Sequence, residues 1–292
     1  MTASTHTPAA QNPPQASGVS LSLEFFPPAT EAGAAKLRDT HAALQTLSPD
    51  FFSVTFGAGG STQARTFETV QTIAAAGSDV APHLTCVGAT RDSIRELLDG
   101  YRAQGIRRIV ALRGDLPSGM VGLGDFHHAS DLVRFIREHS GDWFHIEVAA
   151  YPEMHPQAAS PDDDLRHFVT KVQAGADSAI TQYFYNAEAY FDFVERARAA
   201  GVTIPIVPGI MPILNYTQLA RFSDNCGAEI PRWVRLRLAG FHDDVDSLRA
   251  FGHDVVVELC RTLLAGGAPG LHFYTMNQAA PTTNIWQALK NG

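Results

Sequence analysis

The sequence has few of the features that mark exported, membrane-bound or nucleic-acid-binding proteins. It contains three cysteines in 292 residues. Cys86, Cys226 and Cys260 stand far apart, with neither the even count of a disulfide framework nor a C-x-x-C metal motif. No apolar run approaches the roughly 20 residues of a membrane-spanning helix, and the formal net charge of −8 gives no reason to expect nucleic-acid binding. We therefore expect reduced, mostly buried thiols, no membrane segment and no nucleic-acid partner.

The first 18 residues differ in composition from the rest of the chain. Residues 1–18 are rich in Pro, Ala, Thr and Gln and almost devoid of large apolar side chains, which is typical of disorder. They lack the basic start and apolar middle of a signal peptide. The sequence thus predicts a disordered tail at 1–18, one folded domain at 19–292 and a cytoplasmic protein. The overall composition, 45% hydrophobic and 18% charged, is that of a globular protein.

Short apolar runs alternate with longer amphipathic segments in the remainder of the chain. The runs are mostly apolar throughout, which is typical of strands covered on both faces in a parallel sheet. Eight such runs occur, at residues 20–25, 51–56, 80–87, 107–114, 143–151, 178–184, 204–210 and 270–275. The segments between them carry apolar residues three and four positions apart, as helices do. Several of these segments end in a glycine suited to a helix C-cap: Gly77, Gly105, Gly175 and Gly201.

Eight strand–helix units predict an α/β fold of the (β/α)₈ or TIM-barrel type. The main alternative is an open doubly wound sheet. We favour the barrel because the count reaches eight and no G-x-G-x-x-G loop follows the first strand. Thr90 and Asp92 are expected N-caps of one helix, and Ser160 is the expected N-cap of another, followed by Pro161 at the first helical position. The stretch 211–269 carries two further helical patterns and no change in composition that would mark a second domain.

Missing motifs narrow the chemistry that such a barrel can perform. The chain has only three lysines, Lys36, Lys171 and Lys290, and none ends a strand, which disfavours a Schiff-base aldolase. The first strand lacks the His-x-His pair of metal-dependent hydrolases. The clusters at 127–128 and 242–244 fall in loops or helix starts, so we expect no metal site. No G-x-S-x-G elbow supports a serine hydrolase.

Polar residues at the strand ends are the candidate site, because TIM-barrel active sites lie at the C-terminal ends of the strands. Glu24 follows an apolar run and is either a solvent-facing residue or a proton donor whose pKa is raised by burial. Asp115 either forms a surface salt bridge with Arg113 or faces a ligand. Gln182, on an aromatic strand, suits the edge of a heterocycle as well as a satisfied core position. A weaker signal is a turn that could cradle a phosphate: Gly57, Gly59 and Gly60. Two carboxylates among neutral polar and aromatic groups suit a large heterocycle and a cofactor that supplies the difficult step.

These strand ends also resemble, in order, those of bacterial methylenetetrahydrofolate reductases. The similar motifs are LEFFPP around Glu24, APHLTC around His83, ALRGD around Asp115, AAYPE around Tyr151, ITQYFY around Gln182, PGIMP around Pro212 and HFYTMN around Tyr274. Each motif alone is weak, but their ordered conjunction from about residue 20 to the C-terminus is highly specific. The resemblance implies a (β/α)₈ barrel that holds FAD along its C-terminal face and reduces 5,10-methylenetetrahydrofolate to 5-methyltetrahydrofolate.

The family resemblance further implies a ping-pong reaction, in which NADH or NADPH reduces the flavin and leaves before the folate takes its place. The product feeds one-carbon metabolism and methionine synthesis, and the family favours homo-oligomers. Glu24 matches the general acid that protonates the leaving amine of the folate, and its apolar surroundings would keep it protonated. Asp115 matches the carboxylate that stabilises the cationic iminium and tunes the flavin. The expected folate contacts are Gln182, Tyr216, which would stack on an aromatic ring, and Met276.

The resemblance also assigns a set of FAD contacts and marks three departures from the family pattern. The expected FAD contacts are Thr55, His83, Arg113, Gly114, Asp115, His128, Ala129, Tyr151, Asp164, His167 and Lys171. His128 stands where Tyr is expected, His167 where Asn is expected, and Gln278 where Arg is frequent. The first two bear on FAD contacts, and the third removes a positive charge from the rim of the site. Two alternatives stay open: a flavin-free methyltransferase barrel linked to folate or corrinoid, and a folate-binding subunit that needs an electron-transfer partner.

Overall fold

The computed structural model of the chain describes residues 18–57, 62–115 and 124–291. The tail predicted at 1–18 therefore lies outside the described residues except for Gly18. Gly59 and Gly60 of the candidate phosphate turn lie outside them as well.

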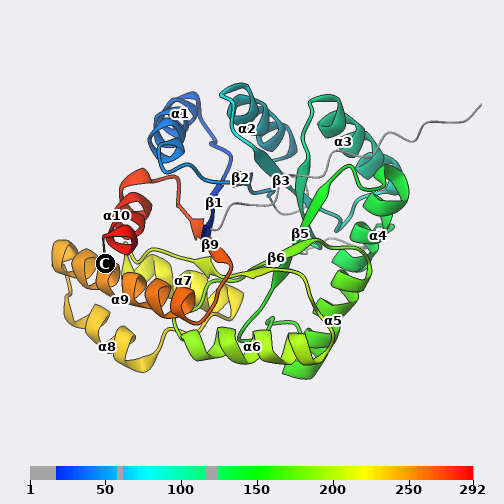
Figure 1. Cartoon of the computed structure of the whole chain (residues 1–292). Helices are drawn as coiled ribbons and strands as arrows, with labels where there is room; N and C mark the ends of the chain where they lie inside the picture. The colour runs from blue at the N-terminus through cyan, green and yellow to red at the C-terminus, as the bar shows by residue number, and fades with distance from the viewer. Residues whose placement is uncertain (1–17, 58–61, 116–123, 292) are drawn as a thin grey trace, which may run out of the picture.

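Nine parallel strand segments of the described chain form one sheet that curves into a nearly closed barrel (Figure 1). The sheet order is β7-β6-β5-β4-β3-β2-β1-β9-β8, so the first strand pairs with both the second and the last. The segments are β1 (Ser20–Phe25), β2 (Phe51–Val54), β3 (Val80–Thr85), β4 (Arg108–Leu112), β5 (His145–Ala150), β6 (Ser178–Thr181), β7 (Ile206–Val207), β8 (Gly209–Ile210) and β9 (Gly270–Tyr274). The predicted TIM-type barrel is confirmed.

The barrel closes through a single interrupted strand, β7 and β8, which change partner at Pro208. β7 pairs with β6 and β8 pairs with β9, because proline has no N–H with which to continue the ladder. The carbonyl of Pro208 accepts from the His272 N–H at 3.0 Å. A Cβ on Gly209 would lie 2.2 Å from the Thr181 carbonyl oxygen, so only glycine fits. The Tyr274 hydroxyl donates to that same oxygen at 2.7 Å, and together these contacts join the two ends of the sheet.

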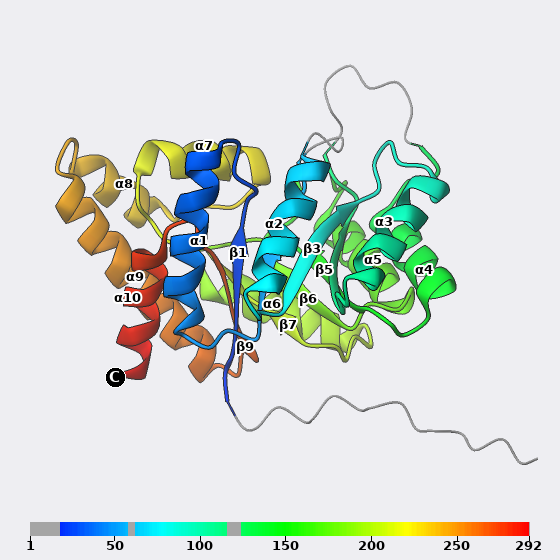
Figure 2. The ribbon, with the colours of Figure 1, turned by 90° about the horizontal axis from the view of Figure 1, so that it is seen from above.

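Helices surround the barrel, and α7 crosses the end at which β1 finishes (Figure 2). The helices are α1 (Glu31–Gln45), α2 (Gln63–Ala75), α3 (Arg91–Ala103), α4 (Ala129–Ser140), α5 (Pro161–Gln173), α6 (Ala187–Ala199), α7 (Tyr216–Cys226), α8 (Arg232–Gly240), α9 (Val245–Ala265) and α10 (Ala279–Lys290). The predicted N-caps Thr90 and Ser160 are confirmed, since Thr90 accepts from Ser93 N–H and Ser160 from Asp163 N–H, each at 3.2 Å. Asp92 lies in the first turn of α3 and is not the cap. The four glycines predicted to end helices all have positive φ. The stretch 211–269 holds three helices and not the two predicted, because the nine-residue α8 is separated from α9 by a tight turn at His242, φ 47°.

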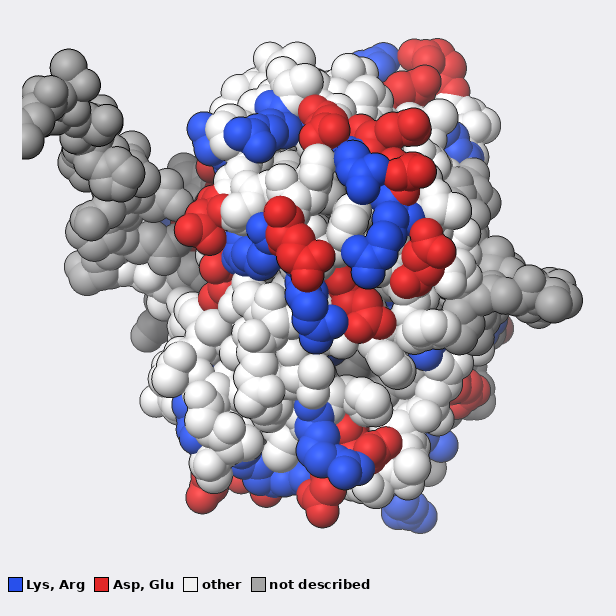
Figure 3. Space-filling view, turned by 90° about the vertical axis from the view of Figure 1, so that its right-hand side faces the viewer, with Lys and Arg blue, Asp and Glu red and all other residues white. Residues whose placement is uncertain are grey.

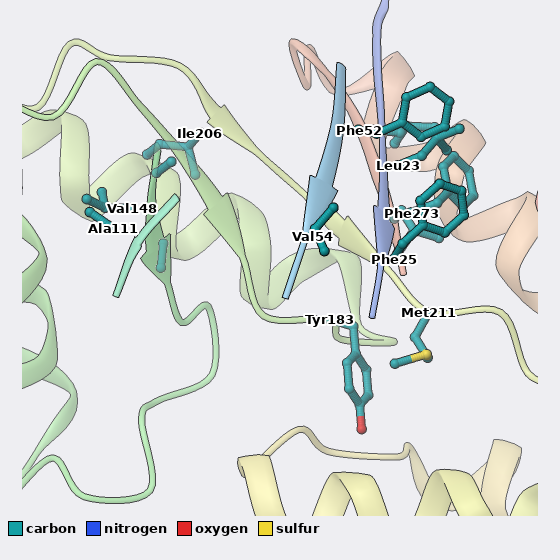
Figure 4. Packing of buried hydrophobic residues seen from close by; sticks show 14 of the residues in the cluster. Leu23, Phe25, Phe52, Val54, Ala111, Val148, Tyr183, Ile206, Met211 and Phe273 are labelled. Atoms are coloured by element: carbon teal, nitrogen blue, oxygen red, sulfur yellow. The ribbon is translucent and has the colours of Figure 1, made fainter. Parts of the chain in front are cut away.

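Apolar side chains fill the space between strands and helices and a thinner layer inside the barrel. Figure 4 shows Leu23, Phe25 and Phe273 gathered with their neighbours on one side of β1 and β9. Leu23 and Phe25 are both fully buried. Since side chains alternate along a strand, Glu24 between them points to the opposite face, into the barrel.

The outer surface over α3, α4 and α5 carries acidic and basic side chains interspersed, without a field of one sign (Figure 3). Each of these helices holds an acid–arginine pair three residues apart: Asp92–Arg95, Asp131–Arg134 and Asp163–Arg166. Exposed pairs of this kind contribute little to stability. Among the described residues, no helix combines the length and apolarity needed to cross a membrane.

Candidate active site

Two adjoining cavities lie at the C-terminal ends of the strands. The inner cavity, about 630 Å³, is lined by residues from β1, β3, β6, α7 and the segment after β9, with Glu24 and His83 among them. The outer cavity, about 380 Å³, lies between the ends of β4 and β5 and the starts of α4 and α5. Both cavities share a wall: Phe56, Leu112, Asp115, Ala149 and Tyr151. The two therefore form neighbouring compartments of one site where TIM-barrel active sites occur.

A carboxylate–histidine cluster, made of Glu24, Ser53, His83 and His272, forms part of the inner cavity and the wall behind it. Oε2 of Glu24 lies 3.2 Å from Nε2 of His83 and 3.5 Å from Nε2 of His272. The Ser53 hydroxyl donates to the same oxygen at 3.4 Å. The Glu24 side chain is only 15% exposed and that of His272 is fully buried. Side chains from β2, β3 and β9 thus converge on one carboxylate oxygen of Glu24.

The environment of Glu24 overturns the expected rise in its pKa. Burial alone raises the pKa of this carboxyl, but the charge of His83 and the hydrogen bonds from His272 and His83 together outweigh burial and lower the pKa to about 2. The sequence prediction was wrong because LEFFPP shows only the apolar neighbours along β1. The polar neighbours come from β2, β3 and β9.

His272 is the site residue that sequence reasoning missed. Its Nδ1 lies 2.8 Å from the Ser22 hydroxyl, which is also buried, and its Nε2 faces Glu24. The signal was available in the alternation of GLHFY: if Phe273 faces the helices, His272 and Tyr274 face the barrel. Ser22, His272 and Glu24 form a continuous polar chain from the barrel interior to the cavity.

The inner cavity is otherwise rich in aromatic and sulfur-containing side chains. Gln182 and Met276, the expected folate contacts, line it, and the Gln182 carboxamide oxygen accepts from the Tyr183 N–H at 3.0 Å. Tyr183 and Met211 point toward α7 (Figure 4), and the Tyr183 hydroxyl lies 3.1 Å from that of Ser223 on α7. Phe222 also lines the cavity. Tyr216, predicted as the stacking residue, begins α7 and is not among the lining residues.

The predicted FAD contacts are brought together along the two cavities. Thr55 and His83 line the inner cavity, and Asp115 and Tyr151 belong to both. The outer cavity is lined by the rest of the predicted set: Arg113, Gly114, His128, Ala129, Asp164, His167 and Lys171. Burial lowers the pKa of Lys171 to about 8 against the opposing effect of Asp164, and the Lys171 ammonium donates to the Ala149 carbonyl at 2.5 Å.

The two histidines that depart from the family pattern lie next to each other in the outer cavity, with their rings tilted by 32°. The ring centroids of His128 and His167 are 5.4 Å apart, and Nε2 of His167 lies 3.7 Å from the Asp163 carboxylate. Gln278, the third departure, precedes α10 and is exposed. It lies outside both cavities and lines a separate hollow between α9 and α10.

The glycine turn, the cysteines and a metal site were the weaker candidates in the sequence. The Gly57 N–H donates to the Thr62 hydroxyl at 2.6 Å, so this amide already has a partner. The three cysteines are free, and Cys226 lines the inner cavity. Across the described ranges, no three His, Cys, Asp or Glu side chains are placed to hold a metal ion.

Comparison with known proteins gives a consistent result. A sequence profile of the family described as methylenetetrahydrofolate reductase matches residues 10–290. A 5,10-methylenetetrahydrofolate reductase of Salmonella typhimurium is 40% identical over 272 residues, which cover 93% of this chain and 90% of that protein. Methylenetetrahydrofolate reductase (NADH) 1 of Arabidopsis thaliana is 38% identical over 273 residues, 88% of this chain but 46% of the plant protein.

One solved structure with a similar fold is an uncharacterized protein from Clostridium thermocellum that binds two copies of 5-methyl-5,6,7,8-tetrahydrofolic acid. It superposes with a TM-score of 0.66 over 94% of each chain, at 18% sequence identity. At that identity the likeness supports the barrel fold alone.

Proposed function

Because the chain belongs to the methylenetetrahydrofolate reductase family, we propose that it reduces 5,10-methylenetetrahydrofolate to 5-methyltetrahydrofolate with bound FAD and with NADH or NADPH as the electron donor. The observation that carries the proposal is the carboxylate–histidine cluster in the wall of an aromatic cavity. Ring opening of the folate needs a group that can pass on a proton beside a flat heterocycle, and the cavity combines Glu24 and its histidine partners with an aromatic lining that suits such a ring.

The residues of the two cavities fit FAD. The inner cavity offers aromatic and aliphatic walls for a planar ring system. The outer cavity gathers Arg113, His128, His167 and Lys171, whose N–H groups suit a pyrophosphate. A Cβ on Gly114 would lie 2.9 Å from Thr85, so this backbone is held close against β3. A flavin held by these residues would supply the hydride-transfer chemistry that links the nicotinamide to the folate.

Glu24 and its histidine partners supply the proton for the folate. The five-membered ring of the substrate opens only when its departing amine nitrogen gains a proton. Since the pKa of Glu24 is held at about 2, the carboxylate must receive a proton before it can pass one on. His83 and His272, at 3.2 and 3.5 Å, are placed to hold that proton next to it.

Other lining residues bind and orient the folate. The Asp115 carboxylate stabilises the positive charge that ring opening leaves on the substrate. The amide of Gln182 is suited to hydrogen-bond the pterin edge. Phe222 and Tyr183 offer rings for stacking with the aminobenzoate. Met276 contributes a soft, adaptable surface.

The size of the inner cavity supports a ping-pong order. About 630 Å³ is within the range of pockets that hold one drug-sized molecule, which favours binding of the nicotinamide and the folate one after the other. The nicotinamide and the folate would then occupy the same space in turn. The proposal extends to a homo-oligomer in the cytoplasm, where the three free cysteines stay reduced, with a product that supplies methionine synthesis.

The test is cofactor content followed by the two half-reactions. Acid release and chromatography of the purified protein should give about one FAD per chain, the stoichiometry of one site. Anaerobic stopped-flow mixing should then show flavin reduction by NADH or NADPH, and reoxidation by methylenetetrahydrofolate. FMN, or no flavin after reconstitution, would overturn the proposal and favour a flavin-free methyltransferase. FAD without reduction by either nucleotide would favour a subunit that needs an electron-transfer partner.

A matched pair of variants localises the cofactor. Arg113→Gln removes a cation from the outer cavity and should weaken FAD binding about tenfold, the effect of losing one charge-assisted hydrogen bond. Arg95→Gln removes an exposed arginine of α3 that forms an ion pair with Asp92 and lies over the Phe135 ring, outside both cavities, and it should leave FAD binding unchanged. Equal affinities in the two variants would place the cofactor elsewhere.

A further inference from the structure

The ends of β1 and β9 are joined in an unusual way beside the inner cavity. β9 pairs in register with β1 up to Tyr274 opposite Glu24. Its backbone then leaves the sheet, because Met276 and Asn277 both have left-handed conformations, with φ of 53° and 54°. Phe26 follows the last residue of β1, and in the described chain its backbone N–H and carbonyl have no strand partner on this side.

Two side chains replace the missing backbone ladder. The Thr275 hydroxyl donates to the Glu24 carbonyl at 2.6 Å. The Asn277 carboxamide binds both backbone groups of Phe26: the Phe26 N–H donates to Oδ1 at 3.1 Å, and Nδ2 donates to the Phe26 carbonyl at 2.9 Å. The Asn277 N–H in turn donates to the Thr275 hydroxyl at 3.1 Å. These bonds fix the backbone on both sides of Phe25.

We propose that Asn277 is a positioning residue for folate reduction: its carboxamide clamps the backbone of Phe26 and so holds the Phe26 ring as a fixed wall of the substrate pocket. The inference rests on the proposed function, since the pocket in question is the folate pocket. Phe26 lines the inner cavity and is 43% exposed, a large exposure for an aromatic side chain. It lies two residues after Glu24, which lines the same cavity.

Asparagine meets both requirements of this position. The side chain must donate one hydrogen bond and accept another in the same plane, which a carboxamide does and a carboxylate does not. The backbone must be left-handed, a conformation that asparagine tolerates better than other residues with a Cβ. Two consecutive left-handed residues, Met276 among them, cost stability and persist here because Thr275 and Asn277 hold the turn.

The clamp can be removed without straining the backbone. Asn277→Gly deletes the carboxamide, and glycine adopts a positive φ without strain. Asn277→Asp keeps the shape and the bond from the Phe26 N–H but cannot donate to the Phe26 carbonyl. Ser48→Gly is the matched control, because Ser48 is also a left-handed residue (φ 57°) and lies before β2, at the other end of the barrel.

The measurement is steady-state and stopped-flow kinetics of the FAD-loaded enzyme, with thermal unfolding as a check on the fold. For both Asn277 variants we expect the KM for methylenetetrahydrofolate to rise about tenfold, with flavin reduction by the nicotinamide within twofold of wild type. Ser48→Gly should match wild type in every reaction. Wild-type KM values in both Asn277 variants would overturn the clamp. A wild-type enzyme without any folate reduction would instead overturn the proposed function.

A double-mutant cycle separates positioning from general support of the barrel. If Asn277 acts through the Phe26 ring, the effects of Phe26→Ala and Asn277→Gly on KM overlap, and the double variant resembles Phe26→Ala alone. Effects that multiply would show that Asn277 does not act through Phe26, and the proposal would be wrong. Should Asn277→Gly unfold, the same cycle with Asn277→Asp gives the answer.

Discussion

Replacing Glu24 with glutamine tests the carboxylate–histidine cluster most directly. Glutamine keeps the shape of the side chain and stands in for the neutral carboxyl, but it can neither carry the charge nor move a proton. The structure predicts two separate effects, one on stability and one on the two half-reactions.

The stability effect follows from the pKa of Glu24. The fall from 4.5 to about 2, at about 1.4 kcal/mol per unit, means that the folded state favours the charged form by about 3 kcal/mol. Because the folded pKa is below the unfolded one, this stability is present above pH 4.5 and is lost as the pH falls toward 2. Glu24→Gln should therefore lower the free energy of unfolding at pH 7 by up to about 3 kcal/mol and flatten its decline between pH 5 and 3.

The kinetic effect should be asymmetric. Flavin reduction by the nicotinamide needs no proton on a leaving amine, so its rate should stay within about tenfold of wild type. Methylenetetrahydrofolate reduction should fall by at least ~10²-fold, the lower range for loss of a general acid. Anaerobic stopped-flow measurement of each half-reaction, at a temperature where the variant is folded, gives both numbers.

The control is Glu138→Gln, which changes an exposed glutamate of α4 with no ion pair in the part of the chain that the structure describes. It should leave both half-reactions and the pH dependence of stability unchanged. If Glu24→Gln slowed the two half-reactions equally, Glu24 would support the barrel or the flavin and would not be the proton donor. If the free energy of unfolding of Glu24→Gln depended on pH as that of wild type does, the claim that Glu24 is ionised in the folded protein would be refuted.

Three further variants test other parts of the molecule. Asp115→Asn should slow folate reduction by roughly 10²–10³-fold and raise the flavin potential, measured by stopped flow and redox titration; wild-type values for both would place Asp115 outside the site. Glu147 is buried and pairs with Arg108 at 2.5 Å. Although burial opposes it, hydrogen bonding from His145 and the Arg108 charge lower its pKa to about 2, so Glu147→Gln should remove about 3 kcal/mol of stability above pH 4.5; denaturant unfolding from pH 3 to 7 would contradict this if wild type and variant ran parallel. Gly209→Ala puts a Cβ 2.2 Å from the Thr181 oxygen and should destabilise by about 3 kcal/mol or more, whereas Gly240→Ala, with nothing within 4 Å, should be close to neutral. Equal melting temperatures for these two variants would show that the junction of β6, β8 and β9 at Gly209 accommodates a side chain.

The features that the sequence predicted are those set by neighbours along the chain. The N-caps Thr90 and Ser160 and the helix-ending glycines depend on a few adjacent residues, and all were confirmed. The runs of the parallel strands were also readable, because burial on both faces leaves a continuous apolar signature. Strand seven was foreseen as one run, but its division at Pro208 depends on its two different partners.

The features that the sequence did not predict are those set by contacts across the barrel. The pKa of Glu24 was given the wrong direction, since His83 and His272 reach it from 59 and 248 positions away along the chain. The place of Tyr216 at the start of α7, with Phe222 instead in the cavity wall, depends on how α7 crosses the barrel end. The residues next to Glu24 or Tyr216 in the sequence indicate neither the contacts of Glu24 across the barrel nor the path of α7.

The proton chemistry of this site depends on closure of the barrel. β1 carries Glu24, and its two neighbours in the sheet are β2, near in sequence, and β9, the last strand. Until β9 pairs with β1, the Glu24 carboxylate lacks His272 as a partner, and the Glu24 backbone carbonyl lacks the hydrogen bond from the Thr275 hydroxyl. Pairing strands so far apart in the chain closes a long loop, which makes such contacts slow to form. Variants where β8 joins β9, such as Gly209→Ala, should therefore impair proton transfer from Glu24 to the folate even where the protein still folds.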